Sequence, residues 1–151
     1  MRILGYRHPK AIEKKTYASF ALSSTHNIYV ECHSRCDLMT ICNLEGDLKY
    51  NIYGPGWFDS DQDKNSYFFE VHTFGNKIIA SYIGSIGLVM KGNIEGAAPS
   101  KLIVFDNEGN YLKTIETGFE FEQFCIDEEN NRIIAYFPER EEPIGYFKIP
   151  L

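Results

Sequence analysis

The chain has 151 residues, of which 44% are hydrophobic and 24% charged, and its formal net charge is −6. This length and composition predict one globular domain with a sizeable core. The negative charge argues against a nucleic-acid binder, which needs a basic face, and against docking on an anionic membrane. No stretch approaches the roughly 20 apolar residues that span a bilayer, and residues 1–10 lack the apolar core of a signal peptide, so we expect neither feature.

The chain divides into an arm, residues 1–16, and a domain, residues 17–151. The arm carries few strand signals and turns basic between Lys10 and Lys15. In the domain a strand pattern occurs three times, at about 17–54, 67–118 and 121–149. The strands expected from β-branched and aromatic runs are, unit by unit, 17–22, 28–31, 38–43 and 48–53; 68–73, 78–82, 102–106 and 111–115; and 121–126, 133–137 and 144–149.

The clearest repeat is a strand–turn–strand unit, which contains Gly46 in the first copy and Gly109 in the second. A glycine there can take the left-handed conformation and close the hairpin through a bulge. Residues 102–105 form a continuous apolar run, which predicts a strand buried on both faces. We therefore predict an all-β protein of three four-stranded antiparallel propeller blades, the third without its last strand. A half propeller of this kind is either completed by dimerisation or truncated from a six-bladed parent.

Two segments interrupt the pattern. Residues 54–65 join the first two units, and residues 84–99 form a long glycine-rich stretch that we expect to be a mobile loop.

The stretch 59–70 carries oxygen-bearing side chains at the spacing of a calcium loop, namely Asp59, Asp61, Asp63, Asn65 and Glu70. Two features depart from that motif. Lys64 stands where a calcium loop requires glycine, and Glu70 falls on an expected strand rather than a helix. The alternative is a solvated acidic loop.

Four cysteines are too few for a disulfide scaffold in a domain of this size. Cys32 and Cys36 have the spacing of half a zinc site, but no second ligand pair follows. They form an unlinked pair, a disulfide or, least in keeping with the pattern, a zinc site. Cys42 and Cys125 lie in apolar strand runs and are expected to be buried, reduced thiols.

The expected ligand-contact residues are Trp57 and Phe58, beside Tyr53 and the glycine–proline–glycine stretch 54–56. Exposed aromatic side chains on a rigid scaffold stack on sugars, peptides or partner chains. The alternative is that Trp57, the only tryptophan, fills a gap between blades.

Residues 102–110, 124–135 and 144–149 carry a pattern that resembles the C-terminal blades of TolB-like six-bladed propeller lipoproteins of gut anaerobes. The resemblance covers residues 67–151 and implies a propeller fold and a location in the cell envelope or periplasm. It implies no catalytic residues, because that family has no assigned activity. The chain departs from the family in having three units rather than six and no lipobox cysteine near Met1.

These observations predict a non-enzymatic binding or scaffold module that presents loops to a protein, peptide or glycan partner. Neither Cys125 near Asp127 nor His72 near Glu70 has the context of a catalytic triad, so no catalytic residue is predicted. The alternatives are a calcium-dependent hydrolase or lyase of the propeller type and a fragment of a larger propeller.

Overall fold

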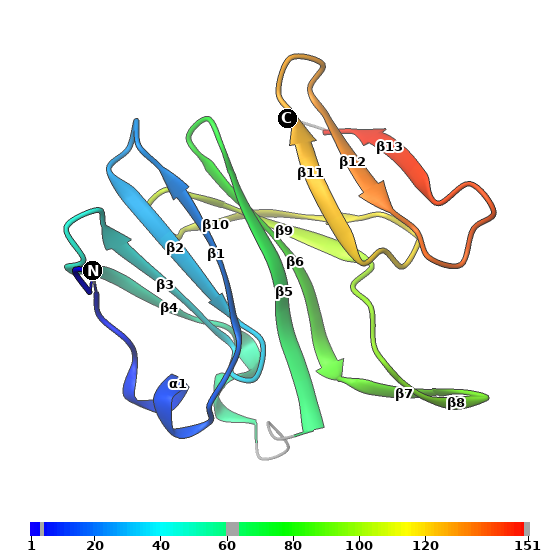
Figure 1. The fold of residues 1–151 in the computed structure, drawn as a ribbon, viewed down its shortest axis with the longest axis horizontal. Helices are drawn as coiled ribbons and strands as arrows, with labels where there is room; N and C mark the ends of the chain where they lie inside the picture. Colours follow the sequence, from blue (N-terminus) through cyan, green and yellow to red (C-terminus); the bar gives the residue numbers. More distant parts are fainter. Residues whose placement is uncertain (4, 60–63, 150–151) are drawn as a thin grey trace.

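The computed structural model describes residues 1–3, 5–59 and 64–149, and its fold is all-β (Figure 1). Three antiparallel sheets of successive strands make up the body, and a two-stranded hairpin projects from it. The first sheet contains β1 (Ala18–Ser23), β2 (Ile28–His33), β3 (Leu38–Asn43) and β4 (Leu48–Tyr53). The second contains β5 (Asn65–Phe74), β6 (Lys77–Ile86), β9 (Lys101–Asp106) and β10 (Tyr111–Glu116). The third contains β11 (Gln123–Asp127), β12 (Arg132–Tyr136) and β13 (Ile144–Lys148).

Turn residues fix the hairpins as the sequence predicts. Gly46 and Gly109 have φ of 99° and 82°. They lie in the turns that join β3 to β4 and β9 to β10, and each of these strand pairs contains a register shift. Asn27 and Asn131 have φ of 52° and 50° and close the β1–β2 and β11–β12 hairpins. These left-handed conformations suit tight antiparallel connections, so neighbouring strands in sequence become neighbours in each sheet.

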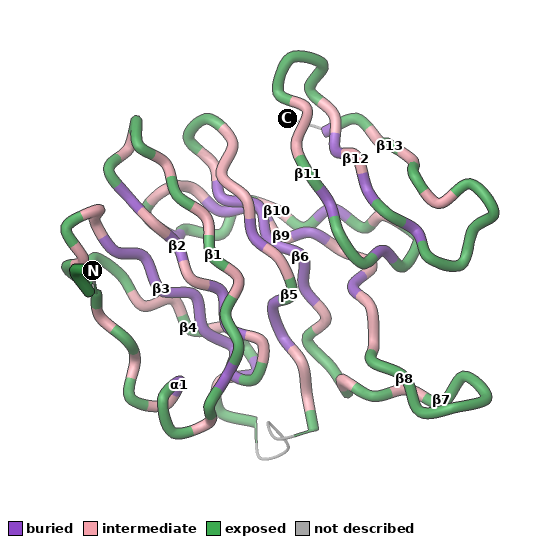
Figure 2. Tube along the Cα trace, in the orientation of Figure 1, coloured by how far each residue is buried: buried purple, intermediate pink, exposed green. Residues whose placement is uncertain are grey.

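The second sheet is buried on both faces because it lies between the other two (Figure 2). Strand β9 shows this directly. Ile103 and Phe105 belong to the core shared with the first sheet, whereas Leu102 and Val104 belong to the core shared with the third. The predicted two-sided burial of residues 102–105 is therefore confirmed.

The prediction of a loop over residues 84–99 is wrong, because most of the stretch forms strands. Strand β6 continues to Ile86, and β7 (Leu88–Lys91) and β8 (Asn93–Gly96) form a hairpin that projects from the body (Figure 1). Its apolar side chains, such as Met90, are exposed, so the segment lacks the buried pattern that marks the other strands. Lys91 Nζ donates hydrogen bonds to Glu120 at 2.6 Å and Glu139 at 2.9 Å, which tie the hairpin to the body.

The N-terminal arm packs on the first sheet. It contains the short helix α1 (Pro9–Glu13), whose first turn is capped by His8 Nδ1, 3.1 Å from the Lys10 backbone nitrogen. The Tyr6 backbone nitrogen donates to the Gly46 oxygen at 3.3 Å. The arm therefore lies along the first sheet.

All four cysteines are free thiols, which agrees with the unlinked pair at Cys32 and Cys36. Cys42 is buried as predicted, but Cys125 is exposed, so that part of the prediction is wrong. Its side chain lies on the opposite face of the third sheet from its neighbour Phe124, which points into the core shared with the second sheet. Among the described residues no helix is long and apolar enough to cross a bilayer.

Candidate functional site

The predicted aromatic site is split by the structure. Trp57 lies in the 3-10 helix η1 (Pro55–Phe58) and packs, half-buried, against Ala11 and Leu38. Its ring centroid is 4.6 Å from that of Tyr53. Phe58 is 90% exposed and takes no part in this cluster.

The arm completes the aromatic cluster around Trp57. The His8 ring lies edge-on to Trp57 at 5.3 Å, and Lys10 Nζ lies 4.4 Å from the centre of the Trp57 ring. Trp57 therefore anchors the arm to the first sheet. It does not fill a gap between sheets, and its ring is already in contact with the protein.

The structure describes three of the five predicted calcium ligands, Asp59, Asn65 and Glu70. Asp61 and Asp63 lie outside the described residues, and Asn65 begins β5. Glu70 Oε2 accepts a hydrogen bond from the Phe124 backbone nitrogen at 2.8 Å and so joins β5 to β11. Within the described part of the chain, no three His, Cys, Asp or Glu side chains form a metal-ligand group. Calcium at this loop stays a prediction.

A cleft of about 550 Å³ lies between the first and second sheets and is lined by residues of β4, β5, β6, β9 and β10. Its walls are mostly apolar and aromatic, and its polar groups are few. The main lining residues are Asp37, Ile52, Tyr53, Phe68, Tyr82, Ile103, Phe105, Tyr111 and Thr114. Concave apolar sites with a few placed polar groups are the usual form of ligand pockets. Of the predicted ligand residues, Tyr53 alone lines it.

Asp37 supplies the acidic group of the cleft and was not predicted as a site residue. It follows Cys36 in the turn before β3, and its exposed fraction is 0%. The Tyr82 hydroxyl and the Gly56 backbone nitrogen both donate to Asp37 Oδ2, each at 2.8 Å. Among the described residues, Oδ1 has no hydrogen-bond partner.

Glycines allow the turn after β4 to approach this carboxylate. A Cβ atom on Gly54 would collide with the Asp37 carboxylate, and one on Gly56 would collide with the Tyr67 ring. The Tyr67 hydroxyl in turn donates to the Gly56 oxygen at 3.2 Å. The stretch 54–56, which the sequence suggested as a loop that presents aromatic residues, instead closes one end of the cleft.

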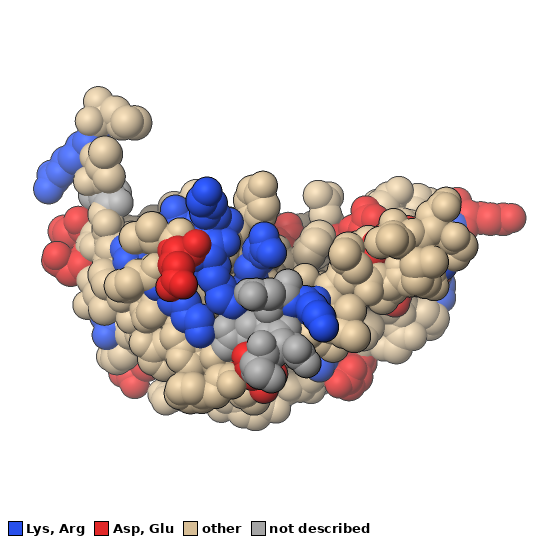
Figure 3. Space-filling view, turned by 90° about the horizontal axis from the view of Figure 1, so that it is seen from below, with Lys and Arg blue, Asp and Glu red and all other residues tan. Residues whose placement is uncertain are grey.

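The charge of Asp37 is poorly compensated. Burial raises its pKa because desolvation disfavours the carboxylate, while the hydrogen bonds from Tyr82 and Gly56 oppose that rise. No Lys or Arg side chain lines the cleft, and Lys101 Nζ lies over the Tyr82 ring at 5.4 Å. Figure 3 shows a group of Lys and Arg side chains on the face of the molecule seen from below.

Comparisons with known proteins show no family for this chain. No family model and no curated protein sequence matches the chain. A solved structure of a Bacteroides caccae protein of unknown function resembles it with a TM-score of 0.35 and 8% sequence identity. The match covers 88% of this chain and 61% of the other, so this chain spans about three fifths of the length of that protein's chain.

Proposed function

We propose that the protein is a non-enzymatic binding module whose cleft receives a basic side chain from a peptide or protein partner. Among the described residues Asp37 Oδ1 has no hydrogen-bond donor, and this buried oxygen of a cleft-lining residue carries the proposal. A buried carboxylate oxygen without a donor is costly, so a cationic donor that reached it from the cleft would relieve that cost.

The shape of the cleft favours a lysine or arginine side chain over a small ion. The apolar walls formed by Phe68, Ile103 and Phe105 suit an aliphatic stem, and the acidic group suits a cationic head. Aromatic faces such as that of Tyr82 also attract cations, by about 0.5–2 kcal/mol. A glycan would use the same carboxylate through hydroxyl donors but would bring no opposite charge to it.

The wider architecture supports a scaffold role. Three successive antiparallel sheets packed face to face are the arrangement of propeller blades, and we propose that they form half of a six-bladed propeller. Completion by a homodimer and a location in the cell envelope, as TolB-like lipoproteins have, remain parts of this proposal. The alternative of a calcium-dependent hydrolase or lyase depends on residues 60–63, which lie outside the described chain.

The test compares two ligands that differ only in the cation. Acetyl-lysine methylamide, blocked at both backbone ends and with its side-chain ammonium free, is titrated into the isotope-labelled protein and followed by NMR at the amides of Tyr82 and Phe105. The norleucine counterpart has a similar stem without the ammonium. We expect lysine to bind at least about tenfold more tightly, because a hydrogen bond to a charged group contributes about 1.5–3 kcal/mol.

The variant Asp37→Asn should abolish the preference for lysine. Its matched control is Glu108→Gln, which removes the same charge from an exposed residue near the cleft. Equal binding of the two ligands to the wild type, or an unchanged preference in Asp37→Asn, would refute the proposal. If an oligosaccharide binds the cleft and Asp37→Asn retains it, the glycan alternative is supported instead.

A further inference from the structure

Within the described residues, the outer strand of the third sheet is unpaired on one side. The first and second sheets have four strands each, and β4 and β10 are their outermost strands. The third sheet has three, and within the described residues β13 pairs with β12 alone. Alternate residues of such an edge strand direct their backbone N–H and C=O groups away from the sheet, where they can pair with another chain.

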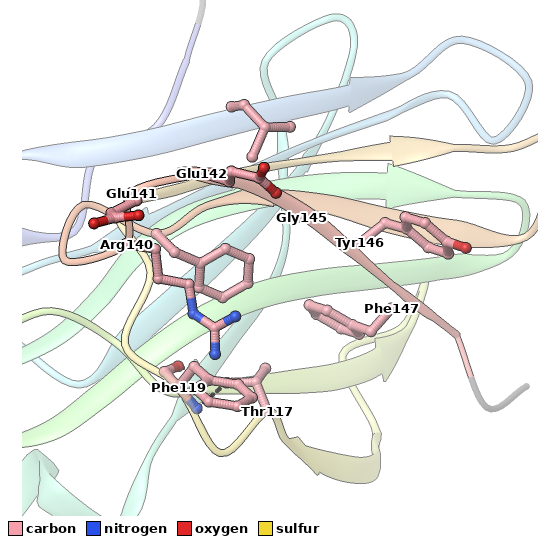
Figure 4. A pocket seen from close by; sticks show the side chains of 10 residues that line it. Thr117, Phe119, Arg140, Glu141, Glu142, Gly145, Tyr146 and Phe147 are labelled. Carbon is pink, nitrogen blue, oxygen red and sulfur yellow. Dashed lines mark hydrogen bonds between the residues drawn. The ribbon is translucent and has the colours of Figure 1, made fainter.

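A pocket of about 480 Å³ adjoins this free edge (Figure 4). It lies between β13 and the segment that follows β10, and Thr117, Phe119, Arg140 and Phe147 are among its lining residues. The Arg140 guanidinium lies 4.3 Å from the centre of the Phe119 ring. The pocket thus combines aromatic surface with a cation held in place by stacking, and Glu141 and Glu142 also line it.

The second sheet shows which element occupies the equivalent position, next to the third strand of the sheet. Strand β10 pairs with β9 and directs Tyr111 and Thr114 into the cleft that faces the first sheet. Among the described residues the third sheet has no such strand. The pocket lies at the corresponding place, next to β13 and facing the second sheet.

We infer that the β13 edge is a strand-addition site for an extended peptide segment of a partner protein. The segment pairs with Ile144–Lys148 and directs an aromatic side chain into the pocket, as Tyr111 enters the other cleft. Main-chain hydrogen bonds then supply affinity, and the pocket beside Arg140 supplies selectivity for the aromatic residue. This surface is separate from the cleft at Asp37, so the inference does not depend on the function proposed above.

The chain's own β10 sequence provides the probe. A synthetic peptide of residues 110–117 is added to the isotope-labelled full chain, and amide hydrogen exchange is measured by NMR. With the peptide at about ten times its Kd, alternate β13 amides should exchange about tenfold more slowly. A peptide with Thr114→Pro should give no protection, because proline cannot continue the ladder.

Two substitutions test the pocket. Tyr111→Ser in the peptide should weaken binding, and Arg140→Ala in the protein should weaken the unmodified peptide about two- to fivefold, as expected for a lost cation–π contact. The matched protein control is Glu128→Ala, in the turn between β11 and β12, which should leave binding unchanged.

Absence of protection at β13, or protection confined to β4 or β10, would overturn the inference. A second outcome would also overturn the inference. If β13 is protected in the absence of peptide, and this protection increases with protein concentration, then a second copy of the chain occupies the edge.

Discussion

The hydrogen bond from Tyr82 to Asp37 allows a sharp test of the energetics of the cleft. Tyr82→Phe removes the hydroxyl that donates to Asp37 Oδ2 at 2.8 Å and leaves that oxygen with the Gly56 backbone nitrogen alone. Near neutral pH, loss of a hydrogen bond to a buried carboxylate should lower the free energy of unfolding by about 1.5–3 kcal/mol. For a chain of this length, a loss of about 2 kcal/mol corresponds to a decrease in Tm of about 4–8 °C.

The cost of Tyr82→Phe should depend on pH. Burial raises the pKa of Asp37, so the neutral carboxyl stabilises the folded state below the unfolded-state pKa, and this contribution is lost as pH rises through the folded-state pKa. The hydrogen bond from the Tyr82 hydroxyl opposes the rise in the pKa of Asp37. Removing the hydroxyl therefore increases the stability that is lost when the Asp37 carboxyl ionises. The difference in free energy of unfolding between variant and wild type should therefore be greater at about pH 8 than at about pH 4.

Urea unfolding at both pH values measures this difference, and Tyr67→Phe is the matched control. The Tyr67 hydroxyl donates to the neutral Gly56 oxygen, so its removal should cost about 0.5–1.5 kcal/mol at either pH. In the Asp37→Asn background, Tyr82→Phe should lose its pH dependence. A cost of Tyr82→Phe that is equal at both pH values, or unchanged by Asp37→Asn, would show that the carboxylate is not the partner that matters.

Three further predictions concern other parts of the chain. Gly109→Ala should lower the free energy of unfolding by more than about 2 kcal/mol, because its φ is 82° and the new Cβ would lie 2.5 Å from Ile52. Gly92→Ala is the control, measured by the same denaturant unfolding. Gly92 has a similar φ of 80° but open space around it, so this change should cost about 1 kcal/mol. Burial lowers the pKa of His33 to about 4, so stability present above the unfolded-state pKa of 6.5 should be lost as pH falls toward 4, and His33→Gln should show a shallower loss in Tm over that range. Calcium should leave Tm unchanged, and a rise that Asp61→Ala abolishes would instead establish the calcium loop.

The sequence was a good guide where local signals and burial agree. The turns at Gly46 and Gly109 and the continuous apolar run of β9 predicted the sheets and the two-sided core, because both signals are local. The β7–β8 hairpin was missed because its apolar side chains face solvent and show no burial pattern.

The candidate site was harder to predict because packing creates it. The partners of Asp37, Gly56 and Tyr82, are 19 and 45 residues away in sequence, and no motif joins them. Trp57 carried an aromatic signal typical of ligand sites, but only the folded arm shows that its ring is already occupied. Asp37, a single polar residue between a cysteine and an apolar strand, gives no comparable signal in the sequence.

The exposure of Cys125 has a consequence for handling the protein. Three of the four thiols are buried in the folded chain, so an oxidant meets a single accessible sulfur, on the outer surface of the third sheet. Oxidation of the folded chain should therefore join molecules in pairs and should not produce longer polymers. Storage under reducing agent, or substitution of this cysteine by serine, would keep such covalent pairs from being mistaken for a native dimer.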